Sequence, residues 1–120
     1  MAAKDDLGRA GEERAVQHLS ALGYTIVERN WRCAQGEIDI VALDAGELVF
    51  VEVKTRRTDR YGHPFEAIDA RKKRRMWGLA HAWAVSHREA ARGRRIRLDG
   101  IGIIGPVPDA GALEHLADLT

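Results

Sequence analysis

The feature that most constrains this chain is one apolar segment that contains a carboxylate. Residues 47–55 read Glu-Leu-Val-Phe-Val-Glu-Val-Lys-Thr, a composition typical of a strand at the centre of a sheet. Side chains alternate between the faces of a strand, so we expect Glu52 and Lys54 on the same face. A buried carboxylate without a partner is costly, so Glu52 requires a cation, a metal ion or hydrogen-bond donors. The segment therefore predicts either a simple Glu52–Lys54 ion pair or part of a functional site.

The rest of the pattern predicts one small α/β domain over residues 1–120 with a mixed sheet. The first expected element is a helix that Asp5 or Asp6 caps and that runs to about residue 22, with Leu22 on its apolar face. Strands are expected over 24–28, 37–43, 47–55 and 96–104, and a basic loop over 55–64. A helix is expected over 69–88, with an apolar side supplied by Met76, Leu79, Ala80 and Trp83. Short connections favour an antiparallel meander for the first three strands. The intervening helix favours a parallel return of the fourth strand beside the third. The tail from Pro106 holds one more short element of undetermined type.

Composition excludes several classes of protein. Cys33 is the single cysteine, so no internal disulfide is expected, and this favours a reducing compartment. No apolar run approaches the ~20 residues that a membrane helix needs. The first residues also lack the basic-then-apolar layout of a secretory signal. We therefore expect a cytoplasmic protein that does not enter a membrane.

Other motifs do not support zinc, nucleotide or acyl-transfer chemistry. The five histidines show no zinc spacing, and no nucleophile elbow is visible. Residues 100–105 spell the dinucleotide-binding pattern G-x-G-x-x-G. That motif must follow a strand and open a helix, whereas here the run lies within a predicted strand and meets Pro106. We reject it as a nucleotide site.

The net charge of +1 conceals a strong segregation of charge along the chain. Residues 54–97 hold 14 Lys or Arg and 4 Asp or Glu, whereas residues 1–53 hold 5 and 10, and residues 98–120 hold 0 and 4. A basic middle between acidic flanks indicates either a surface for a polyanion beside a carboxylate cluster, or a solvated basic helix face.

The second predicted strand supplies further carboxylates. By alternation, Glu37 and Asp39 are expected on one face and Ile38 and Ile40 on the other. A short antiparallel connection brings Asp39 near Glu52. Two facing carboxylates repel unless a cation lies between them. Mg²⁺ takes one or two carboxylates and fills its shell with waters and phosphate oxygens. Together with Lys54, this set provides the parts for metal-assisted hydrolysis of a phosphodiester.

These residues resemble a known family. Residues 36–39 (Gly-Glu-Ile-Asp) and 50–56 (Phe-Val-Glu-Val-Lys-Thr-Arg) are similar to the small bacterial YraN-like proteins, which belong to the PD-(D/E)xK nuclease superfamily beside the archaeal Holliday-junction resolvases. Asp39, Glu52 and Lys54 match the D…ExK signature of that superfamily residue by residue.

The resemblance covers most of the chain, from about Leu7 to Ile101. Residues 8–12 (Gly-Arg-Ala-Gly-Glu) resemble the family's G-x-x-G-E element, and resolvase-like members place an additional active-site glutamate there, which maps to Glu12. The resemblance implies a restriction-endonuclease-like αβββαβ core, in which a mixed sheet is flanked by helices.

The resemblance also implies the roles of individual residues. Asp39 and Glu52 would bind Mg²⁺ or Mn²⁺, with the carbonyl of Val53 as a third protein ligand. Lys54 would position the attacking water or help to deprotonate it, and Glu12 would assist from the helix. In-line attack would leave a 5′-phosphate and a 3′-hydroxyl.

Several further residues are candidates for the same site. Glu37 either assists the metal through a water or faces solvent at a strand start. Arg56, Arg57 and Arg60 follow Lys54 directly, so we expect them to contact nucleic-acid phosphates. Lys72, in the basic run that starts the long helix, is also expected to bind nucleic acid, as the member of that run that points toward the site.

Three functions remain open from the sequence. The first is a metal-dependent endonuclease that acts on DNA, including branched or structured DNA. The second is a catalytically silent module of the same fold that binds DNA or RNA. The third is an interaction protein whose basic segment docks an acidic partner. Resolvases that cut two strands symmetrically are dimers, and the sequence leaves open whether this protein is a homodimer.

Overall fold

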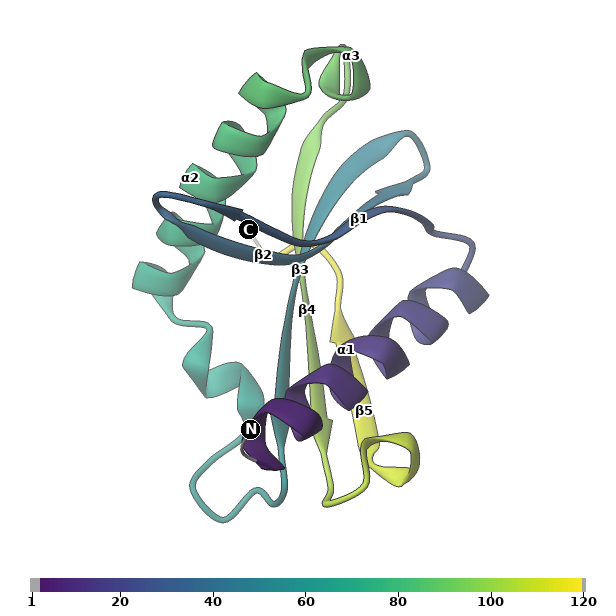
Figure 1. Cartoon of the computed structure of the whole chain (residues 1–120), viewed down its shortest axis with the longest axis vertical. Helices are drawn as coiled ribbons and strands as arrows, with labels where there is room; N and C mark the ends of the chain where they lie inside the picture. Colours follow the sequence, from purple (N-terminus) through teal and green to yellow (C-terminus); the bar gives the residue numbers. More distant parts are fainter. Residues whose placement is uncertain (1–2, 120) are drawn as a thin grey trace.

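The computed structural model describes residues 3–119, which form one five-stranded sheet with helices on both faces (Figure 1). The strands lie in the order β1-β2-β3-β4-β5. The elements in chain order are α1 (Ala3–Ala21), β1 (Thr25–Cys33), β2 (Gly36–Asp44), β3 (Glu47–Arg56), η1 (Pro64–Ala67), α2 (Ala70–Ser86), α3 (Arg88–Ala91), β4 (Ile96–Ile104), η2 (Pro108–Ala110) and β5 (Ala112–Leu116).

The strand pairing confirms the predicted topology. β1, β2 and β3 form an antiparallel meander, and β4 returns parallel to β3. The tail element left undetermined by the sequence is β5, which pairs antiparallel with β4. The structure is therefore the mixed α/β fold that was predicted, with β3 at the centre of the sheet.

The two faces of the sheet bury separate apolar clusters. Under α1, Ala15 and Leu19 pack against alternate residues of the sheet, including Val49 and Val51. Under α2, the predicted apolar face is buried against the other set of alternate residues: Met76, Leu79, Ala80 and Trp83 against Leu48 and Phe50. Nowhere between residues 3 and 119 is there a helix with the length and apolar character needed to cross a bilayer.

The helix and strand ends differ from prediction near the N-terminus. α1 is already helical at Ala3, so Asp5 and Asp6 lie within the helix and neither occupies the position before its first turn. Leu22, assigned to its apolar face, is 56% exposed because α1 ends at Ala21. β1 continues to Cys33, well beyond the predicted end, because it is an edge strand whose polar side chains face solvent while its backbone pairs with β2.

The glycine-rich run 100–105 begins inside β4, as expected. A β-carbon at Gly102 would come 3.2 Å from Cβ of Pro64, and one at Gly100 would come 3.1 Å from Cδ1 of Ile68. These glycines therefore let η1 and Ile68, which follows it, pack directly on the strand, which is a structural reason for the pattern and not a nucleotide site.

Candidate functional site

The candidate site lies where β2 separates from β3. The paired residues of this ladder run from Asp44 and Glu47 to Ile40 and Val51. At the next position, Oδ2 of Asp39 accepts a hydrogen bond of 2.8 Å from the backbone N–H of Val53. A side-chain oxygen thus takes the place of a backbone acceptor, and the two strands diverge around the Asp39 carboxylate.

This divergence corrects one prediction about side-chain direction. Ile38 and Ile40 were expected on the same face, but Ile38 packs in the cluster under α2 whereas Ile40 packs in the cluster under α1. Strict alternation holds only while a strand remains regular. It fails here because β2 turns away from β3 at Asp39.

Glu52 is buried and has two lysine partners. The residue is 7% exposed. Its Oε2 lies 3.7 Å from Nζ of Lys54, which confirms that these side chains share a face, and 3.1 Å from Nζ of Lys72. Lys72 comes from α2 and does point toward the site, as predicted. The simple ion pair is therefore present, but with a second cation that the strand alone does not reveal.

The Asp39 carboxylate is surrounded by other acidic side chains. Burial raises the pKa of Asp39 to about 8, and the charges of Glu52, Glu12 and Glu37 act in the same direction. The bond from Val53 N–H opposes this rise only in part. A carboxyl group in this environment gains from a bound cation, because the cation stabilises its ionised form.

Glu12, on α1, adds its negative charge to the same group of carboxylates. Burial raises the pKa of Glu12, a hydrogen bond with Asn30 lowers it, and the charges of Glu37 and Glu52 raise it. Gly11 makes this placement possible, since a β-carbon there would overlap the side chain of Thr55 on β3. The glycine of the G-x-x-G-E element thus allows α1 to approach β3 closely.

Glu37 also belongs to this region. Its Oε2 accepts a bond of 2.9 Å from Nε of Arg32, and its side chain is 36% exposed. It lines a small pocket together with Glu52 and Lys72. The structure therefore brings Glu37 beside the other candidates, while its role through a water stays a prediction.

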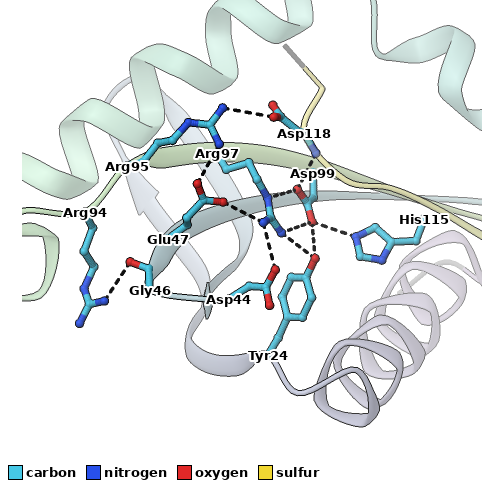
Figure 2. A network of polar contacts seen from close by, with 10 residues as sticks. All are labelled: Tyr24, Asp44, Gly46, Glu47, Arg94, Arg95, Arg97, Asp99, His115 and Asp118. Carbon is cyan, nitrogen blue, oxygen red and sulfur yellow. Dashed lines mark hydrogen bonds and ion pairs between the residues drawn. The ribbon is translucent and has the colours of Figure 1, made fainter.

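The basic segment divides into free and internally paired residues. Arg56, Arg57 and Arg60 are exposed at and beyond the end of β3. Arg97, in contrast, pairs with Asp44, Glu47 and Asp99, and Arg95 with Glu47 and Asp118 (Figure 2). Part of the positive charge of residues 54–97 is thus neutralised inside the fold and is not available to a polyanion.

Asp99 is a buried acid that the sequence analysis missed. Its carboxylate is inaccessible to solvent and accepts bonds from Tyr24, Arg97, His115 and the backbone N–H of Asp118 (Figure 2). Although burial acts in the opposite direction, these donors hold the pKa of Asp99 at about 2. The signal that marked Glu52, an acid within an apolar strand, was present here as well.

The oxygen donors suit a hard divalent cation with few protein ligands. Within residues 3–119, no three His, Cys, Asp or Glu side chains form a ready cluster for a metal ion. The bonds described above use Oδ2 of Asp39 and Oε2 of Glu52, and each carboxylate has a second oxygen. Mg²⁺ needs only one or two carboxylates because it keeps several waters, so the residues present fit this ion.

Comparison with known proteins gives one consistent result. The model of the family described as "Uncharacterised protein family UPF0102" matches residues 11–103. The chain is 48% identical over 116 residues to a UPF0102 protein of Arthrobacter sp. (strain FB24), covering 97% of each chain. It is 50% identical over 106 residues to one from Clavibacter michiganensis subsp. michiganensis, covering 88% of each, and 46% identical over 119 residues to one from Renibacterium salmoninarum, covering 99% of each.

Proposed function

The chain belongs to the UPF0102 (YraN-like) family, and from that premise together with the site geometry we propose that it is a cytoplasmic, metal-dependent endonuclease that hydrolyses DNA. The observation that carries the proposal is the convergence of Asp39 and Glu52 at the divergence of β2 and β3, with Lys54 beside Glu52. Such a set is suited to phosphodiester hydrolysis and is not needed to stabilise a sheet, where apolar residues serve better.

Each residue has a distinct task in this proposal. Bound Mg²⁺ or Mn²⁺ would supply Lewis-acid activation of the phosphate and of a water. Asp39 and Glu52 would hold the ion, with the Val53 carbonyl as a third ligand. Lys54 would orient the attacking water or take up its proton, and it would stabilise negative charge on the phosphate. Glu12 would assist from α1.

The exposed arginines would hold the DNA backbone near these groups. Arg56, Arg57 and Arg60 lie two to six residues beyond Lys54, on the same end of β3. Contacts to phosphate give affinity without sequence preference. The proposal therefore includes DNA recognition by charge and shape, which extends to branched DNA.

The decisive experiment is a cleavage assay with matched variants. Purified protein with Mn²⁺ is incubated with labelled duplex, flap, fork and four-way junction DNA. Asp39→Asn keeps an oxygen that can accept from Val53 N–H but removes the charge, so we expect cleavage to fall by at least about a hundredfold without unfolding. Asp109→Asn, at an exposed position in η2, is the control and should cleave normally.

The alternative is a nucleic-acid-binding module without catalysis, and the lysine pair on Glu52 is the observation in its favour. Both functions predict salt-dependent binding to nucleic acid, so binding alone does not separate them. A divalent-metal site that Glu52→Gln abolishes supports the enzyme. Tight DNA binding without metal affinity or cleavage on any of the four substrates supports the module.

A further inference from the structure

Lys72 is the closest cation to Glu52. Its Nζ lies 3.1 Å from Oε2 of Glu52, against 3.7 Å for Lys54, and its side chain is 21% exposed against 36% for Lys54. The lysine of the D…ExK signature is therefore the more distant and more hydrated partner. The stronger ion pair in the described site is made by a residue on α2.

The position of Lys72 on α2 is unfavourable without Glu52. Asp69 caps the helix by accepting from Lys72 N–H at 2.9 Å, so Lys72 lies in the first turn. Positive side chains are disfavoured at this end because the helix dipole is positive there. The first turn has no acidic residue, and residues 71–75 are all basic. Glu52 is the acidic side chain that forms an ion pair with the Lys72 ammonium at this end of the helix.

A small pocket lies beside this ion pair. A pocket of about 10 Å³ is lined by Glu37, Glu52 and Lys72 together with apolar side chains of the sheet and α2. This volume holds at most about one water. The ammonium of Lys72, 3.1 Å from Oε2 of Glu52, therefore occupies the position that a metal ion bound to this oxygen on this side would take.

We propose that Lys72 is an internal counter-ion that competes with the catalytic metal for Glu52. In the metal-free protein its ammonium neutralises the buried carboxylate. A divalent cation binds when this ammonium leaves Oε2, which the flexible four-carbon side chain permits. Lys72 is thus a positioning residue that sets metal affinity through Glu52. The inference rests on the proposed function, because it assumes that Glu52 is a metal ligand.

The competition has a measurable size. Two unit charges about 4 Å apart interact, even at the dielectric constant of water, by an energy equivalent to roughly a fivefold change in a binding constant. In a partly buried site the effect is larger. Removing the Lys72 charge should therefore tighten divalent-metal binding by at least about fivefold.

Metal titration of single variants tests this inference. Mn²⁺ and Mg²⁺ are titrated calorimetrically into the full chain, and Lys72→Met is compared with Lys73→Met, which removes the same charge one residue further along and is not an ion-pair partner of Glu52 in the described structure. We expect at least about fivefold tighter binding for Lys72→Met, less than twofold change for Lys73→Met, and near wild-type affinity for Lys72→Arg.

The outcomes separate this inference from the function on which it rests. If the wild type binds metal, Glu52→Gln abolishes binding, and Lys72→Met leaves affinity unchanged or weaker, Lys72 is only a structural ion-pair partner and the inference is wrong while the function stands. If the wild type shows no metal binding that depends on Glu52, the proposed function fails first. Thermal unfolding of each variant without metal identifies any loss of affinity that is due to unfolding.

Discussion

Gly11 of α1 faces Thr55 of β3 so closely that a β-carbon at position 11 would overlap the threonine side chain. Glu12 follows directly and contributes to the charge around the site. The same contact therefore joins a helix to the central strand and places a candidate active-site carboxylate.

The first prediction concerns this contact. Gly11→Ala should destabilise the protein by about 1–3 kcal/mol, because α1 must move away from β3, and it should weaken any activity that needs Glu12. Gly8→Ala is the matched control: no atom lies within 4 Å of its β-carbon, so the helix should gain up to about 1 kcal/mol. Urea unfolding measures the free energy of unfolding of both variants. Equal effects at the two positions would contradict the close approach.

The second prediction concerns Asp39 and pH in the metal-free protein. Its pKa is raised from 3.8 to about 8 in the folded state, mainly by burial. A raised pKa of an acid stabilises the fold at low pH, and this contribution is lost as pH rises through the folded-state value. Asp39→Asn mimics the protonated form, so it should be more stable than the wild type above pH 8, by on the order of 1 kcal/mol or more, and similar to it below pH 4.

Urea unfolding from pH 4 to 9 in the presence of a chelator checks this expectation. Asp109→Asn should follow the wild-type curve. Saturating Mg²⁺ should make the wild type more stable than Asp39→Asn at high pH, because only the wild type keeps the Asp39 carboxylate that binds the ion. A constant difference across the whole pH range would rule out the raised pKa.

The third prediction concerns the polar network around Asp99. Hydrogen bonds hold its pKa at about 2 against the opposing effect of burial, so it stabilises the fold above pH 4, and this contribution is lost as pH falls toward 2. Asp99→Asn should cost about 2–4 kcal/mol at pH 7, because the buried Arg97 loses an anionic partner.

Acid unfolding followed by circular dichroism measures this effect. The variant should lose less stability than the wild type between pH 4 and pH 2. Asp59→Asn, at an exposed loop position, serves as the control. Parallel acid-unfolding curves for wild type and Asp99→Asn would show that the group does not titrate as described.

The fourth prediction concerns the exposed arginines. Arg57→Ala should weaken DNA binding at all sequences and reduce the slope of log affinity against log salt by about 0.9 if it contacts one phosphate. Arg88→Ala removes an equal charge from α3, at the opposite end of the molecule from the loop that follows β3 (Figure 1). Fluorescence anisotropy at several salt concentrations should show a change for Arg57→Ala alone. The same loss for both variants would indicate nonspecific attraction only.

The sequence alone was sufficient for the order of the first four strands and for the central role of the segment around Glu52. Strand alternation, turn residues and the helical spacing of Met76, Leu79 and Trp83 are local patterns, and the burial that they predict is found. The need of Glu52 for a partner also follows from its neighbours alone, because desolvation of a charge is costly in any fold.

Only the tertiary structure decided which groups meet Glu52 and Asp39. Lys72 reaches Glu52 because α2 packs across β3, and the Asp39 carboxylate meets Val53 N–H because β2 turns away at that residue. Both arrangements depend on sheet twist and helix placement, which result from the sum of many weak packing contacts between residues far apart in the chain. Local sequence patterns do not determine how these packing contacts add up. The site residues could therefore be named from the sequence, but the contacts between them could not be predicted.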